Sequence, residues 1–161
     1  MNTVILVPTY NEAESLPRLM AGLRAVTDIP VLVVDDDSPD GTSDVASGLD
    51  CHVLRRVENK GLAASVIDGF EEARRLGFDS WIVLDADLQH PPAVVPPMLE
   101  ALESNDMVVG SRYVKGGGTS GWSFWRRLVS RVAAWMAFPI IPKVHDRVGG
   151  LFALHLRVLD G

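Results

Sequence analysis

The sequence contains one cysteine, Cys51, and no long hydrophobic run. A single thiol excludes an internal disulfide and any metal site built from several thiolates, and it is typical of a reducing compartment. The longest stretch without charged or strongly polar side chains, residues 132–141, has about half of the ~20 residues needed to cross a bilayer. Pro139 also interrupts it. We therefore expect neither a disulfide framework nor a membrane-spanning helix in this chain.

Several familiar signatures are missing as well. The 15 basic side chains are outnumbered by 21 acidic ones, which excludes a non-specific grip on nucleic acid phosphates. The four histidines have no metal-ligand spacing, and the start of the chain lacks the basic region and cleavage site of a secretory signal. The chain has no Gly-Lys-Ser phosphate loop, no Gly-x-Gly-x-x-Gly after the first predicted strand and no Gly-x-Ser-x-Gly. These absences argue against P-loop nucleotidases, dinucleotide oxidoreductases and α/β-hydrolases.

What the sequence does have is an alternation of strand-like and helix-like segments. Short apolar runs rich in β-branched residues recur at 4–7, 31–34, 81–84 and 107–109. Between most of them lie segments with helical spacing, and this alternation predicts one α/β domain with a mostly parallel sheet flanked by helices. The first helix is expected to open at 11–14, the second to carry Val45 and Leu49, the third to run over 62–76 until Gly77, and the fourth to open at Pro96 and Pro97.

Polar clusters follow three of the predicted strands, at residues 8–12, 35–42 and 85–90. In open α/β sheets, ligands bind beyond the carboxyl ends of the strands, so these clusters mark the expected site. Acidic clusters at one sheet edge would repel each other without a cation or a cationic ligand between them. The sequence therefore predicts a cation or a cationic ligand at this edge.

Asp85 and Asp87 come directly after the third apolar run, with Gln89 two residues further on. Two carboxylates and an amide oxygen are ligands suited to Mg²⁺ or Mn²⁺, which often bind through one or two carboxylates plus substrate phosphates. A solvated turn is the alternative explanation of an isolated Asp-x-Asp. Its position after an apolar strand favours the metal site.

Three consecutive aspartates, residues 35–37, end the second predicted strand. A turn and a helix N-cap that uses Ser38, Asp40 or Thr42 is one interpretation. Three carboxylates exceed what capping requires, so one of them is a candidate acceptor for a nucleobase or ribose. Lys60, between an asparagine and a glycine before a helix, suits a phosphate, although a solvated lysine fits equally well.

A basic, glycine-rich loop at 110–118 presents Arg112, whose planar guanidinium suits phosphate oxygens. Residues 119–141 then combine aromatic and aliphatic side chains with Arg126, Arg127 and Arg131. Such a composition is typical of a helix in a membrane interface, and an ordinary amphipathic core helix remains open.

Four motifs, in this order, carry a resemblance to a known family: Pro-Thr-Tyr-Asn-Glu at 8–12, Val-Asp-Asp-Asp-Ser-Pro-Asp-Gly at 34–41, Asp-Ala-Asp-Leu-Gln-His-Pro-Pro at 85–92 and Gly-Ser-Arg-Tyr at 110–113. The chain resembles the family 2 glycosyltransferases, especially those that make polyprenyl-phosphate mannose. The resemblance implies a GT-A (Rossmann-like) fold. Residues 146–152 resemble a further family motif, but Arg147 and Gly149 replace its proline and serine.

The resemblance also implies roles for individual residues. Guanosine would be held by Pro8, Tyr10, Glu12, Val34 and Asp36. Metal and diphosphate would be held by Asp85, Ala86, Asp87 and Gln89, with Asp85, Asp87 and Gln89 as the metal ligands. The residues expected to take part in catalysis are Asp87, Arg112 and Arg126, with both arginines on phosphates and Arg112 also on the donor. Lys115 would belong to a mobile acceptor loop.

The resulting hypothesis is an inverting, metal-dependent transfer of mannose from GDP-mannose to dolichyl or polyprenyl phosphate at the cytoplasmic face of a membrane. The family normally continues beyond the last motif, so residues 1–161 are expected to be a single GT-A domain that is truncated at its C-terminus. A membrane segment is then expected from further chain or from a partner. Two alternatives stay open: a polyprenyl-phosphate glucosyltransferase that uses UDP-glucose, and a non-catalytic nucleotide-binding or membrane-recruiting module.

Overall fold

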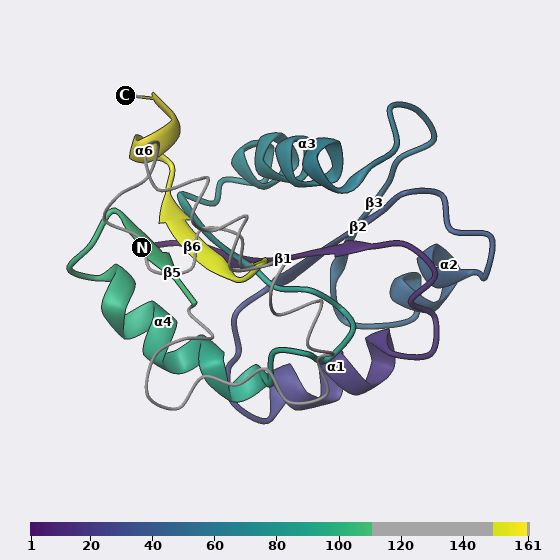
Figure 1. Cartoon of the computed structure of the whole chain (residues 1–161), viewed down its shortest axis with the longest axis horizontal. Helices are drawn as coiled ribbons and strands as arrows, with labels where there is room; N and C mark the ends of the chain where they lie inside the picture. Colours follow the sequence, from purple (N-terminus) through teal and green to yellow (C-terminus); the bar gives the residue numbers. More distant parts are fainter. Residues whose placement is uncertain (111–149, 161) are drawn as a thin grey trace, which may run out of the picture.

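The protein, seen in a computed structural model that describes residues 1–110 and 150–160, is built around one mixed β-sheet (Figure 1). In this part of the chain the strand order is β3-β2-β1-β4-β6-β5. The strands are β1 (Thr3–Thr9), β2 (Val31–Asp35), β3 (His52–Arg55), β4 (Ser80–Val83), β5 (Met107–Val109) and β6 (Phe152–His155). β1 pairs in parallel with β2 and β4, and β2 pairs in parallel with β3. β6 runs antiparallel to both β4 and β5.

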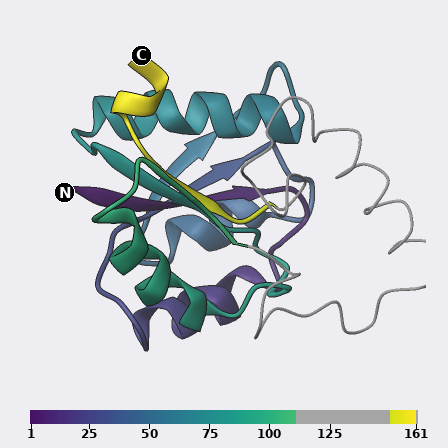
Figure 2. The same ribbon diagram turned by 60° about the vertical axis from the view of Figure 1, so that its left-hand side comes forward.

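Helices cover both faces of this sheet. They are α1 (Leu16–Arg24), α2 (Thr42–Ser47), α3 (Leu62–Arg75), η1 (Pro92–Val94), α4 (Val95–Leu102) and α6 (Arg157–Asp160). α3 lies on one face, and α1, α2 and α4 lie on the other (Figure 1). The short α6 lies on the same side as α3 (Figure 2). Within the described ranges, no helix is both long and apolar enough to cross a bilayer.

The central strand β1 contributes to a core on each side because its side chains alternate between the two faces. Ile5 and Val7 pack in the core that includes α1 and α4, whereas Val4 and Leu6 pack in the core beneath α3. All four are fully buried. Burying such an aliphatic side chain stabilises the fold by about 1.5–3 kcal/mol, so β1 is the anchor from which the site loops project.

Pro8 explains why β1 pairs further with β2 than with β4 near the carboxyl edge of the sheet. The amide of Ile5 donates to the Pro30 oxygen on the β2 side (2.9 Å), so the ring nitrogen of Pro8 faces the β4 side. A proline has no amide hydrogen to extend a ladder there. Pairing with β4 stops at Leu6, while pairing with β2 continues to Thr9. The chain after β4 is therefore released into the loop that carries Asp85.

The structure confirms the four predicted strands, the third helix with its end at Gly77 (φ +89°), and the fourth helix with prolines in its first turn. The expected opening of the first helix at 11–14 is wrong, because α1 begins only at Leu16. The amides of Asn11, Glu12 and Ala13 donate instead to side chains that follow β2, at distances of 2.9–3.0 Å. Tertiary hydrogen bonds thus replace the first predicted helical turn.

Two details of the second helix also differ from the sequence-based expectation. α2 ends at Ser47, so Leu49 lies beyond it. Its N-cap is Gly41, in the left-handed region (φ +83°), and no side chain caps it. Asp40 instead accepts hydrogen bonds from the amide and the hydroxyl of Thr42 (3.0 and 2.6 Å), one residue further into the helix. The expected capping by Ser38, Asp40 or Thr42 is therefore replaced by a glycine with the backbone freedom that the turn needs.

Candidate functional site

The polar clusters predicted from the sequence meet at the carboxyl edge of the sheet. β1 lies between β2 and β4, so the loops that follow these three strands are neighbours. Pro8 is opposite Val34 in the β1–β2 ladder, and the amide of Asp36 donates to the Thr9 oxygen (3.1 Å). From β1 the chain continues to β2 and β3 on one side and then crosses back to β4 on the other side of β1. α/β folds bind ligands at such a switch point.

Three aspartates follow β2, and we call Asp35, Asp36 and Asp37 the β2 acidic cluster. Asp35 is fully buried and accepts four hydrogen bonds. The donors are the hydroxyls of Thr9 (3.0 Å), Ser38 (2.5 Å) and Ser43 (2.6 Å) and the amide of Ser38 (3.0 Å). A carboxylate has about four acceptor positions. All acceptor positions of Asp35 are therefore occupied, and its hydrogen bonds connect β1, β2 and α2.

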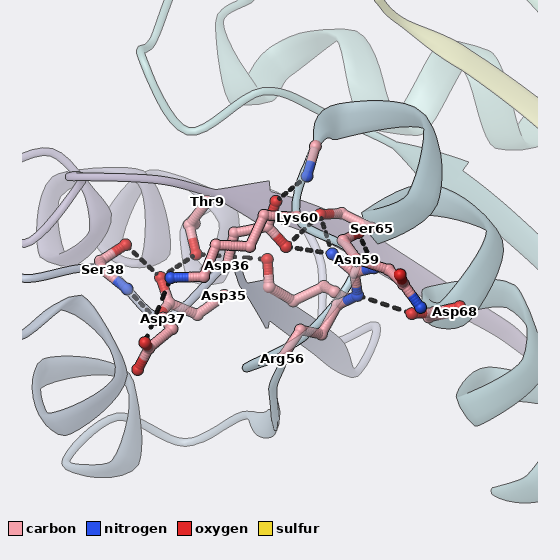
Figure 3. Close-up of polar contacts among 12 residues, drawn as sticks. Thr9, Asp35, Asp36, Asp37, Ser38, Arg56, Asn59, Lys60, Ser65 and Asp68 are labelled. Carbon is pink, nitrogen blue, oxygen red and sulfur yellow. Dashed lines mark hydrogen bonds and ion pairs between the residues drawn. The ribbon is translucent and has the colours of Figure 1, made fainter.

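Asp36 is also held from within the protein (Figure 3). One carboxylate oxygen accepts from the Ser65 hydroxyl (2.6 Å) and from Arg56 Nη1, and the other accepts from the Gly61 amide (2.6 Å). Burial alone would raise the pKa of Asp36, but the hydrogen bonds from Ser65, Gly61 and Arg56 outweigh it and hold the pKa below its usual value. Asp36 is thus ionised and fixed, with one acceptor position remaining for a ligand such as a nucleobase.

Arg56 is the centre of this network. Its side chain is 4% exposed. Nε donates to Asp68 Oδ2 (2.7 Å), Nη1 donates to Asp36 and to the Ser65 hydroxyl (3.0 Å), and Nη2 donates to the Asn59 oxygen (2.8 Å). Arg56 therefore links the ends of β2 and β3 to the loop before α3 and to α3 itself (Figure 3).

Asp37 is paired at the surface. Arg55 donates to it through Nε (2.9 Å) and Nη2 (2.5 Å), and Lys60 Nζ lies 3.2 Å from its other oxygen. The hydrogen bonds from Arg55 and then Lys60 hold the pKa of Asp37 below its usual value. Asp36 and Asp37 are thus paired with the protein's own cations, and Asp35 is held by neutral donors. The expectation that this cluster needs an external cation is therefore wrong.

The loop after β1 supplies the other residues assigned to the nucleoside. Pro8 and Val34 are buried, whereas Tyr10 is 58% exposed at the sheet edge. Glu12 is half-buried, and its carboxylate accepts a hydrogen bond from Ser15. The structure thus places an exposed aromatic ring and a half-buried carboxylate in the chain segment that runs beside the β2 acidic cluster.

Two aspartates follow β4, and we call Asp85 and Asp87 the β4 acidic pair. Asp85 is half-buried, Asp87 and Gln89 are exposed, and Ala86 between the aspartates is buried. Burial raises the pKa of Asp85, and the nearby charge of Asp87 raises it further, while His90 opposes the shift. The backbone amide of Gln89 donates a hydrogen bond to the Asp87 carboxylate (2.9 Å). The two carboxylates are therefore close enough to repel each other.

The β4 acidic pair fits a hard divalent cation in its donor chemistry. Its ligand atoms would be carboxylate oxygens, which Mg²⁺ and Mn²⁺ prefer, and Gln89 carries an amide oxygen two residues further along the chain. Within residues 1–110 and 150–160, no group of three or more His, Cys, Asp or Glu side chains is arranged so that it could hold a metal ion. A cation here would take two carboxylates from the protein and complete its shell with other oxygens, as Mg²⁺ commonly does with waters and substrate phosphates.

One feature of the edge was not visible in the sequence. Asn11, Asp37, Asn59 and Leu88 have positive φ angles of 61°, 53°, 50° and 61°, and they lie one each in the loops that follow β1, β2, β3 and β4. Asn and Asp tolerate this conformation, but a leucine rarely adopts it. Backbone strain of this kind clusters at binding and catalytic sites. Leu88 turns the chain between Asp87 and Gln89, and its side chain packs against the core.

Some predicted residues lie outside the described residues: Arg112, Lys115, Arg126 and the segment 119–141. Their roles stay predictions. In the other direction, sequence reasoning missed Arg56, Ser65 and Asp68. The only local signal was an arginine directly after a short strand, and no spacing rule connects it to an aspartate 20 residues earlier. The described cavity lined by Arg24, Cys51 and His52 (about 390 Å³) adjoins the amino ends of β2 and β3, away from this edge.

A mixed sheet with one reversed strand, helices on both faces and an Asp-x-Asp loop beside the central strand defines a GT-A glycosyltransferase fold. Glucosyl-3-phosphoglycerate synthase from Mycobacterium tuberculosis, in a complex with Mn²⁺, UDP-glucose and phosphoglyceric acid, superposes with a TM-score of 0.76. The match covers 98% of this chain and 58% of that chain at 17% identity, so it bears on the fold alone. The model of the family described as glycosyl transferase family 2 matches residues 4–160, and the chain belongs to that family.

Curated relatives share more sequence. A dolichol-phosphate mannosyltransferase of Pyrococcus furiosus is 41% identical over all of this chain and 48% of its own length. An undecaprenyl-phosphate mannosyltransferase of Micrococcus luteus is 43% identical over 81% of this chain and 56% of its own length. A polyprenol monophosphomannose synthase of Mycolicibacterium smegmatis is 36% identical over 98% of this chain and 63% of its own length. The chain thus spans from about half to less than two thirds of these relatives.

Proposed function

We propose that this chain is the donor-binding part of an inverting glycosyltransferase that, with Mg²⁺ or Mn²⁺, transfers mannose from GDP-mannose to dolichyl or polyprenyl phosphate. Residues 1–161 belong to one catalytic domain in this proposal. Membership of glycosyltransferase family 2 supports the reaction class, and the names of three relatives support mannose and a polyprenyl phosphate acceptor.

The observation that carries the proposal is the β4 acidic pair. Asp85 is half-buried beside a second carboxylate, and its pKa is raised because burial and Asp87 both disfavour its charge. No cationic side chain among the described residues forms an ion pair with either aspartate. Two carboxylates that repel each other at a ligand-binding sheet edge fit a site that a divalent cation completes.

Each group of residues has a separate task in this mechanism. Tyr10, Glu12 and the fixed carboxylate of Asp36 bind the nucleoside, while Asp85, Asp87 and Gln89 hold the cation. Bound there, the cation supplies positive charge that stabilises a departing diphosphate. The acceptor phosphate is already anionic at neutral pH, so no side chain has to remove a proton from it, in contrast to transfer to a sugar hydroxyl. A single displacement at the anomeric carbon inverts its configuration.

The site of action follows from the acceptor. A polyprenyl phosphate resides in a membrane, so we propose that the protein works at a membrane surface, on its cytoplasmic face. The aromatic and basic segment 119–141 is the expected contact. Co-sedimentation of the chain with vesicles containing anionic lipid, compared with vesicles of neutral lipid, tests this part of the proposal.

The decisive experiment incubates the protein with radiolabelled GDP-mannose, a short polyprenyl phosphate and Mn²⁺, and then extracts the lipid. We expect a labelled, β-linked mannosyl lipid that disappears when EDTA removes the metal. An α-linked product would contradict inversion. Labelled lipid formed from UDP-glucose and not from GDP-mannose would identify UDP-glucose as the donor. Because the chain is shorter than its relatives, donor binding is measured alongside transfer. Neither binding nor transfer of either donor would favour a non-catalytic module.

A further inference from the structure

Gly150 lies directly against Asp85, one of the two residues of the β4 acidic pair. In the antiparallel ladder between β4 and β6, Val83 is opposite Phe152. Continuing that register by two residues places Gly150 opposite Asp85. A Cβ atom added to Gly150 would lie 2.6 Å from Asp85 Oδ2, 3.3 Å from its Cγ and 3.4 Å from its Oδ1. The carboxylate of Asp85 therefore occupies the space that any other residue at position 150 would fill.

We propose that Gly150 is a positioning residue for the divalent cation: by having no side chain, it leaves room for the Asp85 carboxylate to stand beside Asp87. The inference rests on the proposed function, because it concerns the cation that the β4 acidic pair would hold. It goes further by assigning a role to a residue that precedes β6 and has no side chain with which to bind the cation itself.

The backbone that follows Gly150 is held in the sheet, whereas the side chain of Asp85 accepts no hydrogen bond from the described residues. Gly150 directly precedes Leu151, whose oxygen accepts a hydrogen bond from the Gly110 amide (2.9 Å), and Phe152 begins β6. In the described part of the chain, no hydrogen-bond donor holds the carboxylate of Asp85, in contrast to Asp35 and Asp36. A clash between the two residues would consequently be relieved by rotation of Asp85.

The size of that rotation decides its effect on metal binding. An ordinary van der Waals contact begins at 3.4 Å, so the carboxylate oxygen would have to move by 3.4 − 2.6 = 0.8 Å. Mg²⁺ requires oxygen ligands at about 2.0–2.1 Å in nearly ideal geometry, so a ligand displaced this far is lost or badly placed. The same rotation costs the fold little, because Asp85 gives up no hydrogen bond to residues 1–110 or 150–160. The backbone at Gly150 also lies outside the left-handed region, so alanine adds no backbone strain.

The test compares Gly150→Ala with a matched control, Gly48→Ala. A Cβ at Gly48 would have its nearest contact at 3.4 Å, with the Val45 oxygen, which is an ordinary contact far from the β4 acidic pair. The affinity for Mn²⁺ is titrated calorimetrically in the presence of GDP, and the urea midpoint is measured without metal. We expect Gly150→Ala to weaken Mn²⁺ binding by about 10- to 100-fold, as for other residues that orient metal ligands, with an unchanged urea midpoint. Gly48→Ala should bind Mn²⁺ as the unchanged protein does.

A second comparison shows whether the effect passes through Asp85. In an Asp85→Asn background, adding Gly150→Ala should cause no further loss of Mn²⁺ affinity. A further loss there, unchanged affinity in Gly150→Ala alone, or a Gly150→Ala chain that fails to fold would each overturn the inference, the last because Asp85 would not have absorbed the clash. If the unchanged protein itself binds no Mn²⁺ in the presence of GDP, the proposed function fails first.

Discussion

The two acidic groups at the sheet edge look alike in the sequence and differ in the structure. Every carboxylate of the β2 acidic cluster accepts hydrogen bonds from at least two other side chains or amides. In the β4 acidic pair, one backbone amide donates to Asp87, and no described residue donates to Asp85. The pKa values of Asp36 and Asp37 are lowered, and that of Asp85 is raised.

The β2 acidic cluster is thus held by the protein itself, whereas the β4 acidic pair is open to a ligand. Where the protein supplies its own donors and cations, the carboxylates are held in place before any ligand arrives, as is useful for recognising a nucleoside. Where the described residues supply one backbone donor and no ion-pairing side chain, as at the β4 acidic pair, the charge is left for an external cation. A run of aspartates in a sequence therefore does not by itself identify a metal site, because the partners of each carboxylate decide its role.

The strongest test of the comparison removes Asp87. Asp87→Ala should lower the proposed metal-dependent mannosyl transfer by at least about 100-fold, because the cation would lose one of two carboxylate ligands and the diphosphate would lose its counter-charge. Transfer is measured as labelled lipid. Asp28→Ala, an exposed aspartate near the other edge of the sheet, is the control and should keep full activity. Full activity in Asp87→Ala would mean that the β4 acidic pair holds no catalytic metal.

The next largest effect is expected in the β2 acidic cluster. Arg56→Met should lower the free energy of unfolding by about 3–5 kcal/mol, since it leaves the buried charge of Asp36 without its cation. Urea denaturation measures this change. A titration with GDP in the absence of urea should show weaker binding, because Arg56 no longer positions Asp36. A loss below about 1 kcal/mol would mean that solvent or a rearranged neighbour replaces Arg56.

How much of this arrangement the sequence could reveal depends on how local each feature is. The Asp-x-Asp loop was predictable because the strand and its carboxylates are adjacent in the chain. Arg56 was not, because its partners come from β2, from the loop before α3 and from α3. β3 and β6 were missed for a related reason: β3 begins and ends with exposed polar side chains, and β6 contains no β-branched residue. Such strands are defined by their neighbours in the sheet.

A smaller effect with a defined pH dependence is expected for Ser65→Ala, which removes one of the three donors to Asp36. The lowered pKa means that native Asp36 binds a proton less readily than unfolded Asp36. Its contribution to stability is therefore complete above the unfolded value of 3.8 and is lost as the pH falls through the lower folded value. Ser65→Ala should cost about 1–2 kcal/mol at pH 7 and less at pH 3, measured by urea denaturation. An equal cost at both pH values would dissociate Ser65 from the ionisation of Asp36.

The β4 acidic pair should respond with the opposite sign. The raised pKa of Asp85 means that its charged form is disfavoured in the native state, so stability falls as the pH rises from 3.8 through the folded value. Asp85→Asn should therefore raise the urea midpoint slightly at pH 7 without metal, while it weakens Mn²⁺ binding. At pH 3 the gain should vanish, because Asp85 is then protonated in both states. A lower midpoint at pH 7 would show that Asp85 has a stabilising partner.

The smallest effect isolates burial from charge. Arg55 and Arg56 are neighbours in the chain and pair with neighbouring aspartates, but the Arg55 side chain is 57% exposed and that of Arg56 is 4% exposed. Water screens the exposed pair and solvates either partner when the other is removed, so Arg55→Met should leave the urea midpoint unchanged within error. Lys60 also remains beside Asp37. If Arg55→Met instead destabilised the protein as much as Arg56→Met, the contribution of the β2 acidic cluster to stability would come from its total charge. The contrast with the β4 acidic pair would then rest on the number of nearby cations and not on hydrogen bonds within the protein.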